Sequence, residues 1–77
     1  METEFEVPKP GTELGNNTIY VLEAHRSDKT RNVNALLLIP GTVQPFVSCI
    51  MVGSATFMYG HYYANVNEAL TDYLERR

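Results

Sequence analysis

The sequence predicts an α+β domain: a four-stranded antiparallel meander sheet with one C-terminal helix packed on one face, preceded by an extended N-terminal arm. Four short stretches rich in β-branched and aromatic residues are separated by turn residues. A helical apolar stripe closes the chain, and prolines and glycines crowd its beginning. Short connections favour antiparallel neighbours, so the simplest strand order is sequential. With 77 residues, we expect an arm over 1–17 and a single domain over 18–77.

The first 17 residues are predicted to form an arm because two prolines and two glycines exclude a regular helix. This segment is also acidic, with four glutamates against one lysine. Its sizeable apolar residues are Phe5, Val7 and Leu14. The arm can therefore dock across the domain or on a partner.

Four strands are expected, over residues 18–26, 33–39, 46–52 and 56–63. The first turns polar towards a basic loop, and the second ends at Pro40 and Gly41. The third stops at Gly53. Gly60, inside the fourth, is typical of a β-bulge.

The C-terminal segment predicts a helix that begins at about residue 66. Asn65 stands at the N-cap position, with Glu68 three residues later as in a capping box. Asp72 and Arg76 form an i, i+4 ion pair on such a helix. The apolar stripe consists of Val66, Ala69, Leu70, Tyr73 and Leu74, and it ends at Arg77.

The second and third strands are apolar on both faces, whereas one helix can cover only one face of the sheet. The arm, a second copy of the chain or a different protein must therefore cover the other face. Because so small a domain is marginally stable alone, we expect a homodimer, with an unidentified protein partner as the alternative. The expected interface residues are Leu36, Leu38, Val47, Cys49 and Met51, together with Phe5 and Val7 of the arm.

Composition excludes several classes of function. A net charge of −3 argues against nucleic-acid binding, and no apolar run is long enough to span a membrane. The acidic N-terminus lacks the features of a secretory signal, so we expect a cytoplasmic protein. The lone Cys49 is expected to be a buried thiol with a raised pKa, and the two histidines lack metal-ligand spacing, so no catalytic residue, metal or cofactor is predicted.

The leading functional hypothesis is a small non-enzymatic protein–protein interaction module that acts through its apolar sheet face. Its size favours an accessory or inhibitory protein of a phage or mobile element.

The alternative hypothesis is a binder of a small ligand, a nucleotide or single-stranded nucleic acid. Strict alternation in the fourth strand would place Phe57, Tyr59, His61 and Tyr63 on one face, and Met58 and Tyr62 on the other. Aromatic rings beside cations suit bases and nucleotides. The candidate ligand-binding residues are Arg26, Lys29 and Arg31 of the basic loop 25–31, with Tyr59, His61 and Tyr63.

Overall fold

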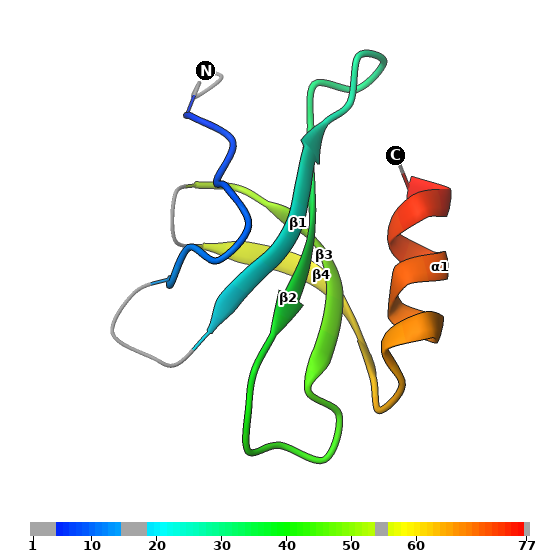
Figure 1. Ribbon diagram of the computed structural model, residues 1–77. Helices are drawn as coiled ribbons and strands as arrows, with labels where there is room; N and C mark the ends of the chain where they lie inside the picture. Colours follow the sequence, from blue (N-terminus) through cyan, green and yellow to red (C-terminus); the bar gives the residue numbers. More distant parts are fainter. Residues whose placement is uncertain (1–4, 15–18, 54–55, 77) are drawn as a thin grey trace.

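The computed structural model describes residues 5–14, 19–53 and 56–76. It contains four strands followed by one helix, which are β1 (Tyr20–Arg26), β2 (Val33–Leu38), β3 (Phe46–Met51), β4 (Phe57–Tyr63) and α1 (Val66–Arg76). The strands form one antiparallel sheet in the order β1-β2-β3-β4. The helix lies on one side of this sheet and the N-terminal arm on the other (Figure 1). The predicted fold class is confirmed.

Helix α1 covers the middle and the β4 side of one sheet face, since it contacts β2, β3 and β4. Its buried residues Ala69 and Tyr73 pack with Leu36 of β2. Val66 and Leu74, at the borders of the predicted stripe, remain exposed, so the buried stripe is narrower than the sequence indicates. We call this side of the sheet the helix face.

The start of α1 is fixed by Asn65. Its side-chain Oδ1 accepts a hydrogen bond from the backbone N–H of Asn67 at 2.7 Å, which satisfies one of the free donors of the first turn. The predicted N-cap is confirmed.

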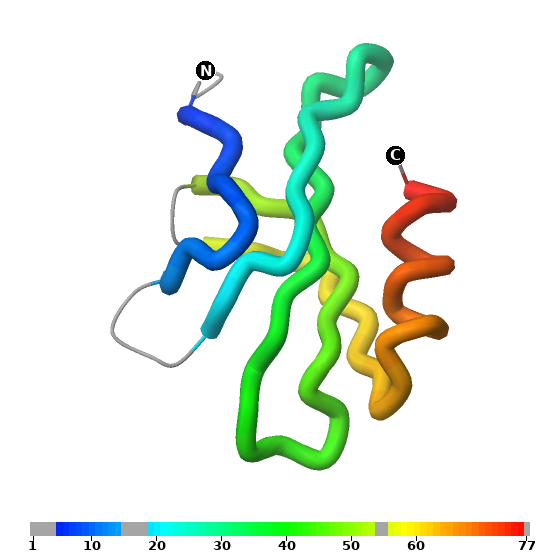
Figure 2. Tube along the Cα trace, viewed as in Figure 1, coloured from blue at the N-terminus to red at the C-terminus, as the bar shows by residue number. Residues whose placement is uncertain are grey.

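The arm covers the opposite face of the sheet, which we call the arm face. Leu14 is buried, and Phe5 and Val7 pack against the same cluster of core residues. The arm also bonds to the outer edge of β1, because the N–H of Gly11 donates to the carbonyl of Val21 at 2.7 Å. The tube view shows the arm running beside β1 (Figure 2). The chain itself therefore supplies the cover that the sequence requires for the second face.

Arg26 ties the beginning of the described arm to the sheet. Its guanidinium donates a hydrogen bond to the carbonyl of Phe5 at 2.6 Å and lies 5.5 Å from the centroid of the Phe5 ring. This pair combines a charge-assisted hydrogen bond with a cation–π contact. Arg26 thus holds the arm in place.

The expected grouping of the interface residues on one face is wrong. The register of β2 and β3 sets Leu37 opposite Val47, and cross-strand partners share a face. Leu36 and Leu38 therefore lie on the helix face, while the residues of β3 in that set lie on the arm face. The latter are Val47, Cys49 and Met51. Apart from Leu38, which is half-buried, these sheet residues are buried within the single chain.

A β-bulge interrupts β4, as Gly60 predicts. Ser48 pairs with His61 and Ile50 pairs with Met58, which leaves two residues of β4 opposite Cys49. These are Tyr59 and Gly60. Tyr59 has a φ of 58°, a left-handed conformation that is uncommon for a residue with a Cβ atom.

The bulge makes the expected face assignment in β4 wrong. Phe57 pairs with Met51 and so lies on the arm face, whereas His61 and Tyr63 lie on the helix face. Met58, the register partner of Ile50, joins the helix face. One extra residue shifts the alternation of every side chain that follows it.

We predict that Gly60→Ala destabilises the fold by about 1–3 kcal/mol, as overpacking of a filled site does. A Cβ atom on Gly60 would lie 3.2 Å from Cγ1 of Val47 and 3.2 Å from Cε1 of Tyr62. Chemical denaturation measures the free energy of unfolding. Gly53→Ala is the matched control, because its Cβ would meet nothing closer than 3.9 Å. Equal stability of the two variants would contradict this packing of the bulge.

Candidate functional site

A polar cluster joins β4 to the last turns of α1 around the carboxylate of Asp72. The hydroxyl of Tyr63 donates to its Oδ2 at 2.5 Å, and Nδ1 of His61 lies 2.7 Å from the same oxygen. Nε of Arg76 donates to Oδ1 at 3.0 Å. We call these four residues the Asp72 cluster.

The cluster keeps Asp72 ionised. Partial burial alone would raise the pKa of this carboxyl, but the hydrogen bonds from Tyr63, His61 and Arg76 outweigh burial, and the charge of Arg76 adds to them. Together they lower the pKa of Asp72 from its ordinary 3.8 to about 2. The hydrogen bond to Asp72 also raises the pKa of Tyr63, so this phenol remains a donor at neutral pH.

The ionised state of Asp72 fixes the tautomer of His61. A carboxylate can only accept hydrogen bonds, so Nδ1 of His61 must carry the proton that it shares with Oδ2. When the imidazole is neutral, its Nε2 is then an acceptor. The His61 side chain is 60% exposed, which leaves the ring accessible to a ligand or partner.

A hollow of about 450 Å³ borders the Asp72 cluster at the end of α1. Its lining comes from the β1–β2 loop, from three strands and from the helix: Thr30, Asn32, Asn34, Ile50, His61, Asp72, Glu75 and Arg76. Figure 1 shows the β1–β2 loop and the C-terminal end of α1 at the same end of the molecule. We call this site the end hollow.

Arg76 connects the end hollow to the bulge in β4. One guanidinium nitrogen donates to the carbonyl of Tyr59 at 3.0 Å. The backbone carbonyl of Arg76 in turn accepts from Nδ2 of Asn34, a buried side chain of β2, at 3.3 Å. These bonds hold the end of the helix, the bulge and the wall of the hollow in one arrangement.

The structure separates the residues expected to bind a ligand. Arg26 is bonded to the arm, on the face opposite His61 and Tyr63. Lys29 and Arg31 do not line the end hollow, although Thr30 between them does. His61 and Tyr63 come together on Asp72, while Arg26 donates a hydrogen bond to the carbonyl of Arg31, away from them.

Sequence reasoning treated Asp72 and Arg76 as a helix-surface ion pair, which is confirmed. It missed that the same pair faces β4. The signal was present in the helical stripe, because Asp72 and Arg76 each follow a buried residue, Ala69 and Tyr73, at the i, i+3 spacing that shares a helix face.

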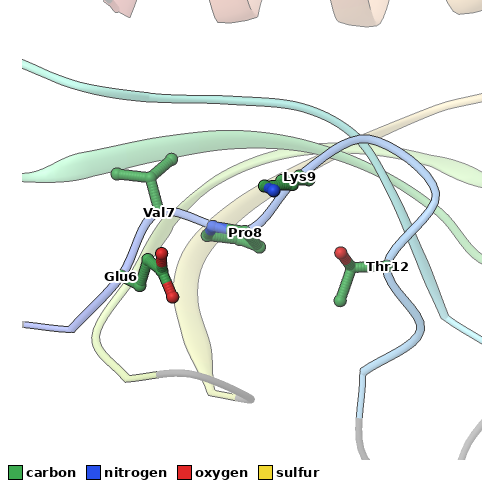
Figure 3. Close-up of a pocket in the computed structure, with 5 residues that line it drawn as sticks. All are labelled: Glu6, Val7, Pro8, Lys9 and Thr12. Carbon is green, nitrogen blue, oxygen red and sulfur yellow. The ribbon is translucent and has the colours of Figure 1, made fainter.

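A second recess of about 370 Å³ lies within the arm and is lined by Glu6, Val7, Pro8, Lys9 and Thr12. Figure 3 shows Glu6 and Val7 pointing to opposite sides of the arm. Val7 packs on the core, and Glu6 is exposed. The recess therefore follows from the turn that the arm makes as it docks.

Cys49 is a buried core residue, as expected. Burial raises the pKa of its thiol to about 12, against a smaller opposing effect of the Arg76 charge. Its side chain lies on the arm face, under the arm, where a thiolate is strongly disfavoured.

Comparison with known proteins finds no matching family model, no matching curated protein and no matching solved structure. Among the described residues, no three His, Cys, Asp or Glu side chains gather in a way that could hold a metal ion. No helix in the described part of the chain has the length and apolarity needed to cross a membrane.

We predict that Asp72→Asn lowers the free energy of unfolding at pH 7 by about 1–2 kcal/mol, since a lowered carboxyl pKa stabilises the folded state whenever the group is ionised. The contribution is present above about pH 4 and is lost as the pH falls towards 2, through the folded-state pKa. Urea denaturation of both proteins across this range measures it.

The difference in stability between the two proteins should shrink across that pH window. Glu75→Gln, on the same helix and exposed, is the control and should leave stability at pH 7 within about 0.5 kcal/mol. The free energies of unfolding of the wild type and Asp72→Asn could instead differ by a constant amount from pH 6 to pH 2, roughly the range in which carboxyls titrate. That result would contradict the ionised state of Asp72 in the cluster.

Proposed function

We propose that this chain is a non-enzymatic protein–protein interaction module that binds a different protein through the outer edge of β4. The contact surface, which we call the β4 edge, consists of Met58, Tyr59 and Tyr62. Met58 borders the edge on the helix face, and Tyr62, the register partner of Val47, borders it on the arm face, so a partner would straddle the edge strand. The observation that carries the proposal is the exposure of these three large side chains on the sheet edge that the arm does not cover.

The arm covers one edge of the sheet, at β1, and leaves the other edge, at β4, uncovered. The outer edge of β1 bonds to the arm, where the N–H of Val21 donates to the carbonyl of Thr12 at 2.8 Å. No described segment pairs with the outer edge of β4. An uncovered edge strand that bears aromatic side chains suits a protein partner, because tyrosines supply large and rigid contact area.

Tyr59 is the central residue of this surface. Its side chain is 69% exposed, so burial in the core does not account for its position. A left-handed backbone conformation costs about 1–2 kcal/mol for a residue other than glycine. The hydrogen bond from Arg76 to its carbonyl supports that conformation. Strain of this kind concentrates where a side chain must be presented for binding.

Two features favour a different protein over a second copy as the partner. The bulge interrupts the middle of β4, where symmetric pairing of two β4 strands would need a regular ladder. Each copy also carries a net charge of −3, so two copies repel each other.

The homodimer and the apolar sheet face expected from the sequence have lost their main argument, because the arm and α1 cover the two faces. The homodimer stays a prediction. So do the cytoplasmic location and the accessory or inhibitory role in a phage or mobile element.

We predict that Tyr59→Asn weakens partner binding at least about tenfold, the loss typical of a central aromatic residue in an interface. Asparagine tolerates the left-handed conformation, so the bulge should persist. Native mass spectrometry of the protein gently purified from its own host identifies the complex, and titration with the purified partner measures affinity.

Val43→Asn is the matched control, because Val43 is 90% exposed in the β2–β3 loop and lies outside β4. A complex with a different chain that weakens with Tyr59→Asn and not with Val43→Asn supports the proposal. A homodimer sensitive to Tyr59→Asn would overturn the choice of a different protein. Equal binding by both variants would overturn the β4 edge as the site.

A further inference from the structure

We infer that the end hollow receives an arginine or lysine side chain of the partner, an inference that rests on the proposed function. The hollow adjoins the β4 edge, because Ile50 in its lining is the register partner of Met58. A partner seated on Met58 and Tyr59 therefore passes the mouth of the hollow.

Of the three charged side chains that line the hollow, Asp72 and Arg76 are bonded to each other, and Glu75 is not bonded to either. Both oxygens of Asp72 accept hydrogen bonds. Arg76 donates from Nε to Asp72 and from another guanidinium nitrogen to the carbonyl of Tyr59. Glu75 has no hydrogen-bond or ion-pair partner among the described residues. The Asp72–Arg76 pair is neutral as a unit, so Glu75 gives the hollow its negative charge.

Two hydrogen-bond acceptors of the hollow suit a ligand that carries N–H donors. Besides the Glu75 carboxylate, the hollow offers Nε2 of His61, whose other nitrogen is committed to Asp72. A guanidinium or ammonium group satisfies both, since it carries positive charge and several N–H donors. Ile50 supplies an apolar contact for the aliphatic stem of such a side chain.

Among the described residues, no lysine or arginine other than Arg76 lines the hollow. Arg26 is bonded to the carbonyls of Phe5 and Arg31, away from the hollow. Lys29 and Arg31 lie in the β1–β2 loop but are not in the lining. A basic partner also complements the net charge of −3.

The test uses a blocked glycine–arginine–glycine tripeptide and its citrulline counterpart, which keeps the shape of arginine without the charge. Nuclear magnetic resonance titration of the full chain follows the His61 ring, the Asn34 side-chain amide and the Glu75 backbone amide. We expect saturable binding of the arginine peptide with a dissociation constant on the order of millimolar, and binding of the citrulline peptide at least about fivefold weaker.

Glu75→Gln should weaken binding of the arginine peptide at least about fivefold. Glu68→Gln is the matched control, because it removes the same charge from the same helix at a residue outside the hollow. Equal affinity of the two peptides would overturn the inference, because the charge of the arginine side chain would then contribute nothing to binding. Equal loss in the two variants would also overturn it, because only unspecific charge attraction would then remain.

The peptide titration and the test of the β4 edge can refute their two proposals independently. If the arginine peptide does not bind while Tyr59→Asn still weakens the partner complex, the end hollow is not a basic side-chain site and the proposed function stands. If the peptide binds as expected while Tyr59→Asn leaves the complex intact, the proposed β4 edge is overturned.

Discussion

The two central strands of this sheet must be covered on both faces, and the rest of the fold follows from that requirement. Leu36 on the helix face is buried, as are Leu37 and Val47 on the arm face. Helix α1 has only 11 residues and closes one face. The arm closes the other with a few apolar side chains and backbone hydrogen bonds to β1. In so small a domain, the arm over the described residues 5–14 and helix α1 both contribute to the core.

Asp72 joins β4 to the last turns of α1. Its carboxylate accepts hydrogen bonds from two side chains of β4 and one of α1, which fasten the helix to this strand. Arg76, held by Asp72, then reaches the carbonyl of Tyr59. The position of the helix and the shape of the bulge are therefore coupled through one ionised group. Partial exposure of this group makes the coupling cheaper than a fully buried ion pair.

Local signals and short connections allowed the elements and the strand order to be predicted from the sequence, whereas the register of the strands could not be predicted. The strands, the helix and the N-cap at Asn65 depend on neighbours within a few residues, so their patterns are readable. Which face of β2 matches which face of β3 depends on register, which the loop between them sets, and alternation within each strand cannot supply it. The bulge at Tyr59 and Gly60 then inverts the alternation of β4. The Asp72 cluster combines two such unknowns, the face of β4 and the rotation of α1.

Because the arm and α1 cover the two faces of the sheet, we propose that a partner binds at an edge. The edge of β1 is occupied by the arm, whereas Tyr59 and Tyr62 of β4 are exposed. A bulge on an edge strand normally protects it from pairing with other strands. Here the same bulge presents Tyr59 outward, close to the end hollow. Glu75 in the lining of that hollow has no partner among the described residues. A device that prevents unspecific strand pairing can thus admit a partner that binds through side chains, because such a partner does not need the interrupted backbone ladder.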